Sequence, residues 1–164
     1  MRTRCRQGII AALLAATLPV LAAAGATPRF TRRSADGRRL AVAVGKVVSV
    51  FGADGVAIRS FTAPSPVIGL ELCSDGTRLT YQTHDGKAWI YAVEGGLVVP
   101  LFAPAGTMEN FADPSWAQDC QSLVYTVVET RPSAGFMEPN EKSISVYWVK
   151  ADGTEKKVLV TAAG

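Results

Sequence analysis

The sequence predicts an all-β fold built from three repeats of about 40 residues. A short turn motif carries the repeat: Ser-Ala-Asp-Gly at 34–37, Cys-Ser-Asp-Gly at 73–76 and Ala-Gln-Asp-Cys at 117–120. Its aspartates Asp36, Asp75 and Asp119 are 39 and 44 residues apart. A second turn follows in each repeat, at 54–55, 94–96 and 152–153. Such units stack on one another, because a single unit cannot bury both of its faces.

Runs of β-branched and aromatic residues, separated by turn residues, supply the strands. No stretch after residue 26 shows helical periodicity. With four strands to a repeat, as in a propeller blade, the sequence predicts a partial β-propeller of three four-stranded antiparallel blades. The blades are expected at about 28–62, 67–102 and 111–160. The expected strands are 39–44, 47–51 and 56–61, then 67–72, 78–82, 88–93 and 97–102, then 112–116, 122–128, 143–150 and 156–160.

The recurring motif predicts a tight turn in each repeat. An aspartate side chain can accept a hydrogen bond from the backbone of such a turn, and the glycine that follows can take a positive φ. Gly37 and Gly76 fill that glycine position in the first two copies. In the third copy Cys120 follows Asp119 instead, so we expect either backbone strain or a different turn type there.

The first 26 residues read as a secretory signal peptide. Three arginines precede an almost wholly apolar run at 8–21, and small residues follow at 22–26. Cleavage is expected after Ala26, with Ala24 as the alternative site. An uncleaved membrane anchor is the competing interpretation, because the apolar run approaches the length needed to span a bilayer. Pro19 and the alanine-rich end favour cleavage, which would make the protein periplasmic or secreted.

Loss of this segment changes the charge of the chain. The precursor has 17 basic and 14 acidic residues and a net charge of +3. The segment 1–26 carries three of the basic residues and no acidic one, so the remainder is neutral. The composition therefore gives no support for nucleic-acid binding.

Two cysteines remain after the signal segment, Cys73 and Cys120. In an oxidising compartment they can form one disulfide, provided that their Cα atoms come within about 7 Å. Two buried free thiols are the alternative. Neither cysteine has metal-ligand spacing around it, so no metal site is expected, and the sequence implies no cofactor.

The third repeat carries a resemblance to a known family. Pro-Ser-Trp-Ala-Gln-Asp at 114–119, the strand start at 123–125 and the Ala-Asp-Gly turn at 151–153 resemble the repeat of TolB-type β-propellers, which have WD40-like propeller repeats. The resemblance covers about residues 28–160. It departs from the family where Ala35, Ser74 and Gln118 replace the proline before aspartate, and where Cys120 replaces glycine.

This resemblance implies a non-catalytic protein-interaction module of a cell-envelope complex. The alternative is a fragment of a propeller that gates or accompanies a hydrolase domain of the serine peptidase type. The residues themselves offer no catalytic set. The single histidine, His84, stands in an expected hairpin turn, and no nucleophile motif accompanies it. We therefore expect no enzymatic activity, and we expect Trp89, Trp116 and Trp148 to pack between blades.

Partner contacts are expected in two places. An insertion at 129–142 interrupts the third repeat and carries the apolar residues Phe136 and Met137, although an unimportant insertion is the alternative. The end blades are the second place, because propellers close with about four to eight blades and this chain supplies three. An open half-propeller, a fragment or remnant of a longer propeller, and a six-bladed ring of two copies all remain open. The expected partner is a protein of the cell envelope, with self-association through the end blades as a further expectation.

Overall fold

The computed structural model describes residues 29–105, 109–131 and 141–163. These residues form twelve β-strands and no helix. Accordingly, none of them belongs to a helix that is long and apolar enough to cross a membrane. The strands are β1 Phe30–Arg33, β2 Arg39–Val44, β3 Val47–Gly52, β4 Ala57–Thr62, β5 Val67–Leu72, β6 Arg78–Thr83, β7 Ala88–Ala92, β8 Val98–Phe102, β9 Glu109–Trp116, β10 Ser122–Arg131, β11 Glu141–Lys150 and β12 Lys156–Ala163.

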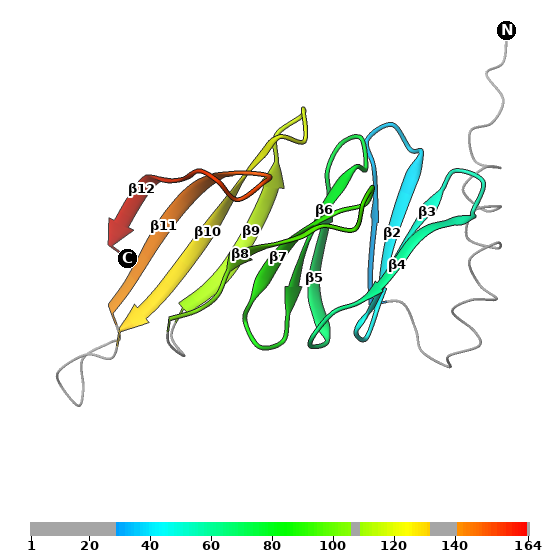
Figure 1. Ribbon diagram of the computed structural model, residues 1–164. Helices are drawn as coiled ribbons and strands as arrows, with labels where there is room; N and C mark the ends of the chain where they lie inside the picture. Colours follow the sequence, from blue (N-terminus) through cyan, green and yellow to red (C-terminus); the bar gives the residue numbers. More distant parts are fainter. Residues whose placement is uncertain (1–28, 106–108, 132–140, 164) are drawn as a thin grey trace, which may run out of the picture.

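The strands form three four-stranded sheets, and all pairings within a sheet are antiparallel between neighbours in the chain. Blade 1 contains β1–β4, blade 2 contains β5–β8 and blade 3 contains β9–β12. Figure 1 shows the three blades side by side in chain order, from blue to red. The first strands lie on one side of the stack, since β1 contacts β5 and β5 contacts β9. The predicted all-β fold of three antiparallel blades is confirmed.

The main differences from the prediction lie at the start of blade 1 and in blade 3, where β9 and β12 are each three residues longer than the expected strands 112–116 and 156–160. Strand β1 was not among the expected strands, because the run Phe-Thr-Arg-Arg has only one apolar residue. The hairpin of β10 and β11 is also longer than expected, since pairing continues from Glu129↔Ser143 to Arg131↔Glu141. The predicted loop at 129–142 is therefore too long. Phe136 and Met137 lie outside the described residues.

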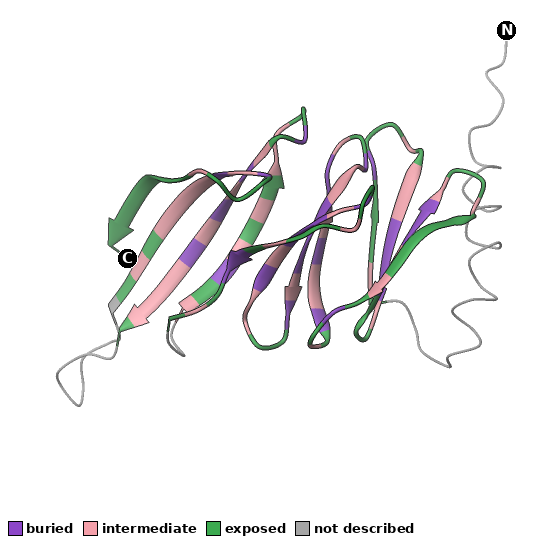
Figure 2. Cartoon of the chain, viewed as in Figure 1, coloured by how far each residue is buried: buried purple, intermediate pink, exposed green. Residues whose placement is uncertain are grey.

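The core lies between the blades rather than within one of them. One cluster joins blades 1 and 2 and includes Val48, Val50 and Leu79, all fully buried. A second cluster joins blades 2 and 3 and includes Ile90 and Tyr125. Figure 2 shows these buried positions in purple along the middle strands. Because burying each large apolar side chain stabilises the fold by about 1.5–3 kcal/mol, the stack is held mainly by these two interfaces.

Candidate functional site

The three motif turns keep one geometry. In each turn the aspartate Oδ1 accepts a hydrogen bond from the backbone N–H two residues later, at 2.9, 2.8 and 2.9 Å for Asp36, Asp75 and Asp119. Gly76 has a φ of 72°, and Cys120 takes the same left-handed conformation at 58°. The turn type is thus retained in the third repeat, and a residue with a Cβ carries the strain.

An arginine links each motif turn to the next blade. Arg39 donates a hydrogen bond from Nη1 to the Gly76 carbonyl at 3.1 Å, and Arg78 donates to the Cys120 carbonyl at 2.8 Å. Each arginine stands three residues after its motif aspartate, and each acceptor follows the aspartate of the next copy. Ser122 occupies the arginine position in blade 3. The link therefore joins blades 1 to 2 and 2 to 3, and in blade 3 a serine stands at the donor position.

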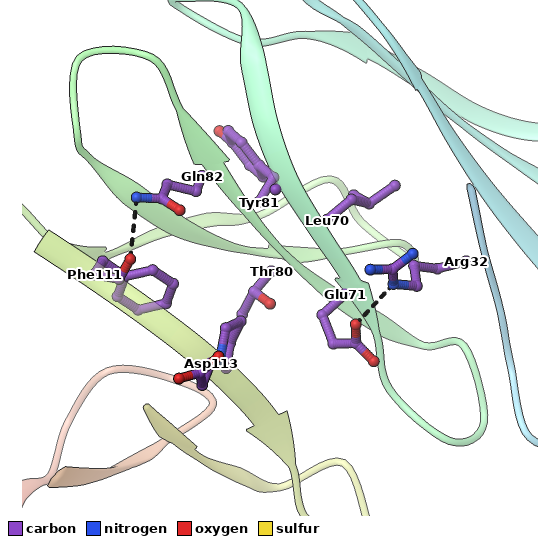
Figure 3. Close-up of a pocket in the computed structure, with 10 residues that line it drawn as sticks. Arg32, Leu70, Glu71, Thr80, Tyr81, Gln82, Phe111 and Asp113 are labelled. Carbon is purple, nitrogen blue, oxygen red and sulfur yellow. Dashed lines mark hydrogen bonds and ion pairs between the residues drawn. The ribbon is translucent and has the colours of Figure 1, made fainter. Parts of the chain in front are cut away.

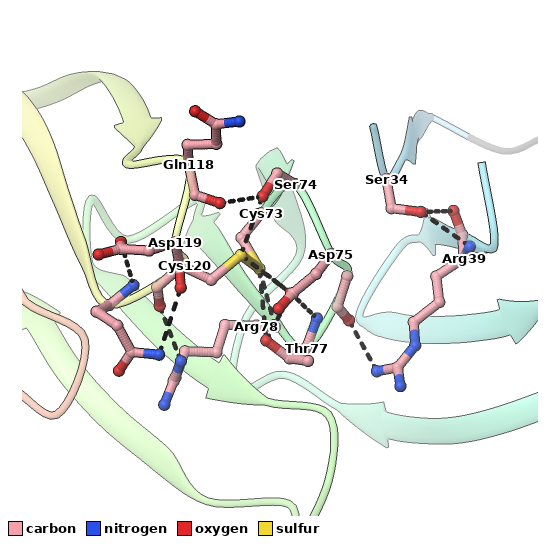
Figure 4. Close-up of a disulfide and its surroundings, with 12 residues drawn as sticks. Ser34, Arg39, Cys73, Ser74, Asp75, Thr77, Arg78, Gln118, Asp119 and Cys120 are labelled. Atoms are coloured by element: carbon pink, nitrogen blue, oxygen red, sulfur yellow. Dashed lines mark hydrogen bonds between the residues drawn. A yellow bond between two sulfur atoms is a disulfide. The ribbon is translucent and has the colours of Figure 1, made fainter. Parts of the chain in front are cut away.

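Cys73 and Cys120 form a disulfide between blades 2 and 3, with their Cα atoms 5.6 Å apart. Figure 4 shows it beside the Arg78 link. The Asp75 Oδ1 atom lies 3.0 Å from each sulfur and also accepts hydrogen bonds from the backbone and hydroxyl of Thr77. Disulfide sulfurs carry no proton, so these two sulfur contacts are not hydrogen bonds. Cys73, Asp75 and Cys120 bring possible metal-ligand atoms within 4.8 Å of one another. The two sulfurs are bonded to each other, however, so they offer no thiolate to a metal.

His84 lies exposed in the turn between β6 and β7, as expected. Its backbone N–H donates to the Pro66 carbonyl at 2.8 Å, and its side chain makes no hydrogen bond or ion pair with the described residues. The neighbouring Asp85 accepts a hydrogen bond from the Thr83 hydroxyl at 2.6 Å. That bond, together with Lys87, lowers the pKa of Asp85. The carboxylate thus serves the turn and does not orient the imidazole.

The three tryptophans do not share one role. Trp89 packs against the cluster between blades 1 and 2, and Trp116 against the cluster between blades 2 and 3. Trp148 differs, because Tyr147 and Val149 beside it belong to the second interface and alternate residues of a strand point to opposite faces. Trp148 therefore lies on the face of blade 3 that points away from blade 2, where the Lys157 ammonium stands 5.4 Å from its ring centroid. The expectation of packing between blades is wrong for this residue.

We call this side of the sheet the outer face of blade 3. Strand alternation and register place on it six apolar residues larger than alanine, none of them buried. Ile144 and Val160 are 41% and 57% exposed. The equivalent face of blade 2 is covered by blade 3, where Thr80 and Ile90 are each 1% exposed. The six residues are Val124, Val128, Ile144, Val146, Trp148 and Val160.

A pocket of about 270 Å³ opens beside the first strands of the blades. Its walls come from β1, β5, β6 and β9, as Figure 3 shows. Arg32 of blade 1 pairs with Glu71 of blade 2 at 2.9 Å, and the Gln82 amide donates to the Phe111 carbonyl of blade 3 at 3.3 Å. Asp113 lies on the blade 3 side of the pocket. All three blades thus contribute to one concave site.

No protein-family model matches the sequence, and no curated protein matches it either. Solved structures do match. The β-propeller domain of Myceliophteria thermophila Cps50 (Swd1) is 11% identical, with a TM-score of 0.55 over 87% of this chain and 45% of that chain. The chain is a partial β-propeller.

Two further propeller matches have different descriptions. A structure described as TolB from Agrobacterium tumefaciens is 16% identical, with a TM-score of 0.55 over 83% of this chain and 50% of that one. The acylaminoacyl peptidase of Pyrococcus horikoshii is 12% identical, with a TM-score of 0.61 over 84% of this chain and 25% of that one. This propeller thus spans half or less of each of the three structures. Likeness at this identity shows the fold alone.

Sequence reasoning missed the blade links and the pocket. A signal for the links was present, because Arg39 and Arg78 stand at the same offset from their motif aspartates. The pocket left a weaker signal in the pair Asp113-Pro114, which is typical of a local break in a strand. The burial of Thr80 has no signal in the sequence, since threonine is common on both faces of strands.

Proposed function

We propose that this propeller is an exported, non-catalytic module that binds another protein in the cell envelope. The outer face of blade 3 is the observation that supports this proposal most strongly. It presents the exposed Ile144 beside the half-buried Val146 and Trp148 along one face of β11. Apolar areas of this kind on soluble proteins mark interaction sites.

The outermost strand of blade 3 adds to this surface. Every residue of β12 is exposed, and Figure 2 draws the strand in green throughout. Its outer edge is an unpaired row of backbone groups, which favours pairing with another chain. Two lysines at its start, Lys156 and Lys157, are the charged groups that oppose uncontrolled pairing. Phe136 and Met137 stay part of the proposal as further partner contacts.

The capture of a partner tests this proposal. The exported chain would be immobilised and incubated with cell-envelope proteins, and each captured protein would be purified and its affinity measured. The double variant Ile144→Lys/Val160→Lys should abolish binding, because two charges cannot be buried in an apolar contact. Leu97→Lys is the matched control, since Leu97 is an exposed apolar residue of blade 2. Equal binding by all three proteins would overturn the proposal for this face.

Export is tested separately by the N-terminal sequence of the processed protein. We expect it to begin at Thr27, or at Gly25 if the alternative site is used. An intact Met1 end in the membrane fraction would instead support the anchor.

The hydrolase-associated alternative keeps its own test. A propeller that gates a peptidase needs a catalytic domain, and residues 29–105, 109–131 and 141–163 form only the three blades. Hydrolysis of peptides or esters by the purified chain, lost on His84→Ala, would contradict the non-catalytic proposal. A peptidase domain encoded next to this chain would favour the alternative.

A further inference from the structure

The pocket beside the first strands contains the buried hydroxyl of Thr80. Thr80 is 1% exposed, and its Oγ1 atom forms no hydrogen bond with the residues that the structure describes. Leaving a buried polar atom unsatisfied costs free energy, so such atoms call for a bonding partner. In Figure 3 the Thr80 hydroxyl lies between the side chains of Asp113 and Glu71, at the wall of the pocket.

Asp113 stands in the same pocket with a strained backbone. Its φ is 50°, in the left-handed region that residues other than glycine rarely adopt. The strain arises at a β-bulge, where the pairing of β9 with β10 shifts register between Val124 and Thr126. Pro114 follows directly and itself disfavours helical conformations of the residue before it. Strained residues of this kind cluster at ligand sites.

The carboxylate of Asp113 has no hydrogen-bond or ion-pair partner among the described residues. Arg32 and Glu71 neutralise each other in their ion pair. The Asp113 carboxylate therefore gives the pocket one uncompensated negative charge. The Gln82 amide nitrogen must face the Phe111 carbonyl, because only the nitrogen can donate. Its oxygen is therefore left to accept.

Three of the unused polar groups of the pocket share one property. The Asp113 carboxylate and the Gln82 oxygen are acceptors, and the Thr80 hydroxyl can accept as well. A ligand that matches them must bring several N–H donors and a positive charge. An ammonium or guanidinium group has both properties. The volume of about 270 Å³ suits one long side chain, since pockets for whole small molecules begin at about 300 Å³.

We propose that this pocket binds the protonated side chain of a lysine or arginine from an extended segment of a partner protein. The alkyl part lies along Phe111, and the cationic end reaches Asp113, Thr80 and Gln82. This inference rests on the proposed function, because it names the chemistry of the partner at a second site, separate from the outer face of blade 3.

The test uses the full chain as the cell processes it and two small probes. Nα-acetyl-lysine N-methylamide carries the cation, and Nα-acetyl-norleucine N-methylamide has an uncharged side chain of similar length. Binding is followed by the amide NMR signals of the protein. We expect the lysine probe to shift signals of β5, β6 and β9, and we expect the norleucine probe to leave them in place.

Two variants locate the bound cation. Asp113→Asn removes the charge and keeps a residue that tolerates positive φ, so the affinity for the lysine probe should fall at least tenfold. Thr80→Val removes the hydroxyl at nearly constant volume, so the affinity should fall about threefold without a lower Tm, because no bond is lost on folding. Asp54→Asn in the blade 1 turn is the charge-matched control and should bind like the wild type.

Equal binding of the two probes would overturn the inference, and so would unchanged affinity in Asp113→Asn. No shift with the lysine probe at its solubility limit would also overturn it. Failure of the proposed function looks different, because the probes would then bind while no envelope protein is captured. If a partner is captured but the probe does not bind, only the inference fails.

Discussion

Cys120 holds a left-handed turn that glycine holds at the equivalent position of blade 2. The cysteine strains the backbone by about 1 kcal/mol relative to glycine. Its sulfur closes a disulfide to Cys73 across a sequence separation of 47 residues. A loop of that size stabilises a fold by about 4 kcal/mol in the chain-entropy estimate. The gain exceeds the strain, so cysteine is the more stabilising residue at this position in an oxidising compartment.

A pair of double variants separates these two effects. Cys73→Ser/Cys120→Gly gives the second junction the serine and glycine that stand at 34 and 76 in the first junction. Cys73→Ser/Cys120→Ala loses the same disulfide but keeps the strain. We expect both to be less stable than the oxidised protein, with the glycine variant about 1 kcal/mol more stable than the alanine variant in urea unfolding. Equal stability of the two variants would show that the left-handed turn carries no strain.

The hydrogen bonds of Asp152 predict that the free energy of unfolding decreases in acid. Hydrogen bonds from the backbone N–H and the hydroxyl of Thr154 lower its pKa. A carboxyl whose pKa is lowered by folding contributes stability above its unfolded pKa, and that contribution is lost as the pH falls through the folded pKa. Asp152→Asn keeps the acceptor oxygen but does not titrate, so its unfolding midpoint in urea should fall less between neutral pH and about pH 2. Thr154→Val should reduce the acid loss in part, and an unchanged pH profile in both variants would refute this account.

At the scale of the element, the arginine links predict how the blades cohere. Arg78→Met removes the 2.8 Å bond from blade 2 to the Cys120 carbonyl and preserves most of the alkyl packing. We expect a loss of about 1.5 kcal/mol in unfolding free energy, as for a hydrogen bond to a charged group. Arg38→Met is the control, because Arg38 is 83% exposed and its distance to Asp36 is 3.9 Å. The control should stay within about 0.5 kcal/mol of the wild type. A similar loss in both variants would mean that general charge, and not the link, is responsible.

The elements also show what could be predicted from the sequence. Turn motifs and apolar runs predicted eleven of the twelve strands that the structure describes. Alternation of apolar and polar residues is typical of strands in a half-buried sheet. Strand β1 was not predicted, because it is polar and lies at a sheet edge, where it pairs only with the backbone of β2. The paired ends of β10 and β11 at the hairpin were not predicted for a similar reason. Glu129 and Arg131 pair with each other at 2.8 Å along a charged hairpin that has no apolar pattern.

The candidate sites were less predictable than the strands. The sequence placed the motif aspartates in turns, but the pocket depends on how three blades approach one another. The meeting of Arg32 with Glu71 across 39 residues has no local signal. The disulfide could not be predicted with certainty, because it depends on the distance between neighbouring blades at one rim of the stack. The length of the repeat does not determine that distance.

At the scale of the whole molecule, the uncovered blade 3 predicts weak self-association. Light scattering at rising concentration should give an average mass above that of a single chain, which is 17.3 kDa for the whole sequence. Ile144→Lys/Val160→Lys should hold the chain at the monomer mass, because lysines on an exposed sheet disfavour pairing. A mass that is constant with concentration in the wild type would contradict this expectation.

The blade links also give the stack a polarity. The donor arginine always belongs to the earlier blade and the acceptor carbonyl to the later one, so the first blade offers the Gly37 carbonyl and the last offers Ser122 in place of a donor. Copies added head to tail would meet without this bond at every new junction. An open heterologous stack can grow into filaments. The serine at position 122 opposes such growth, because it cannot make the link that an arginine would make there. A single Ser122→Arg change would supply the missing donor and turn a terminating blade into a propagating one.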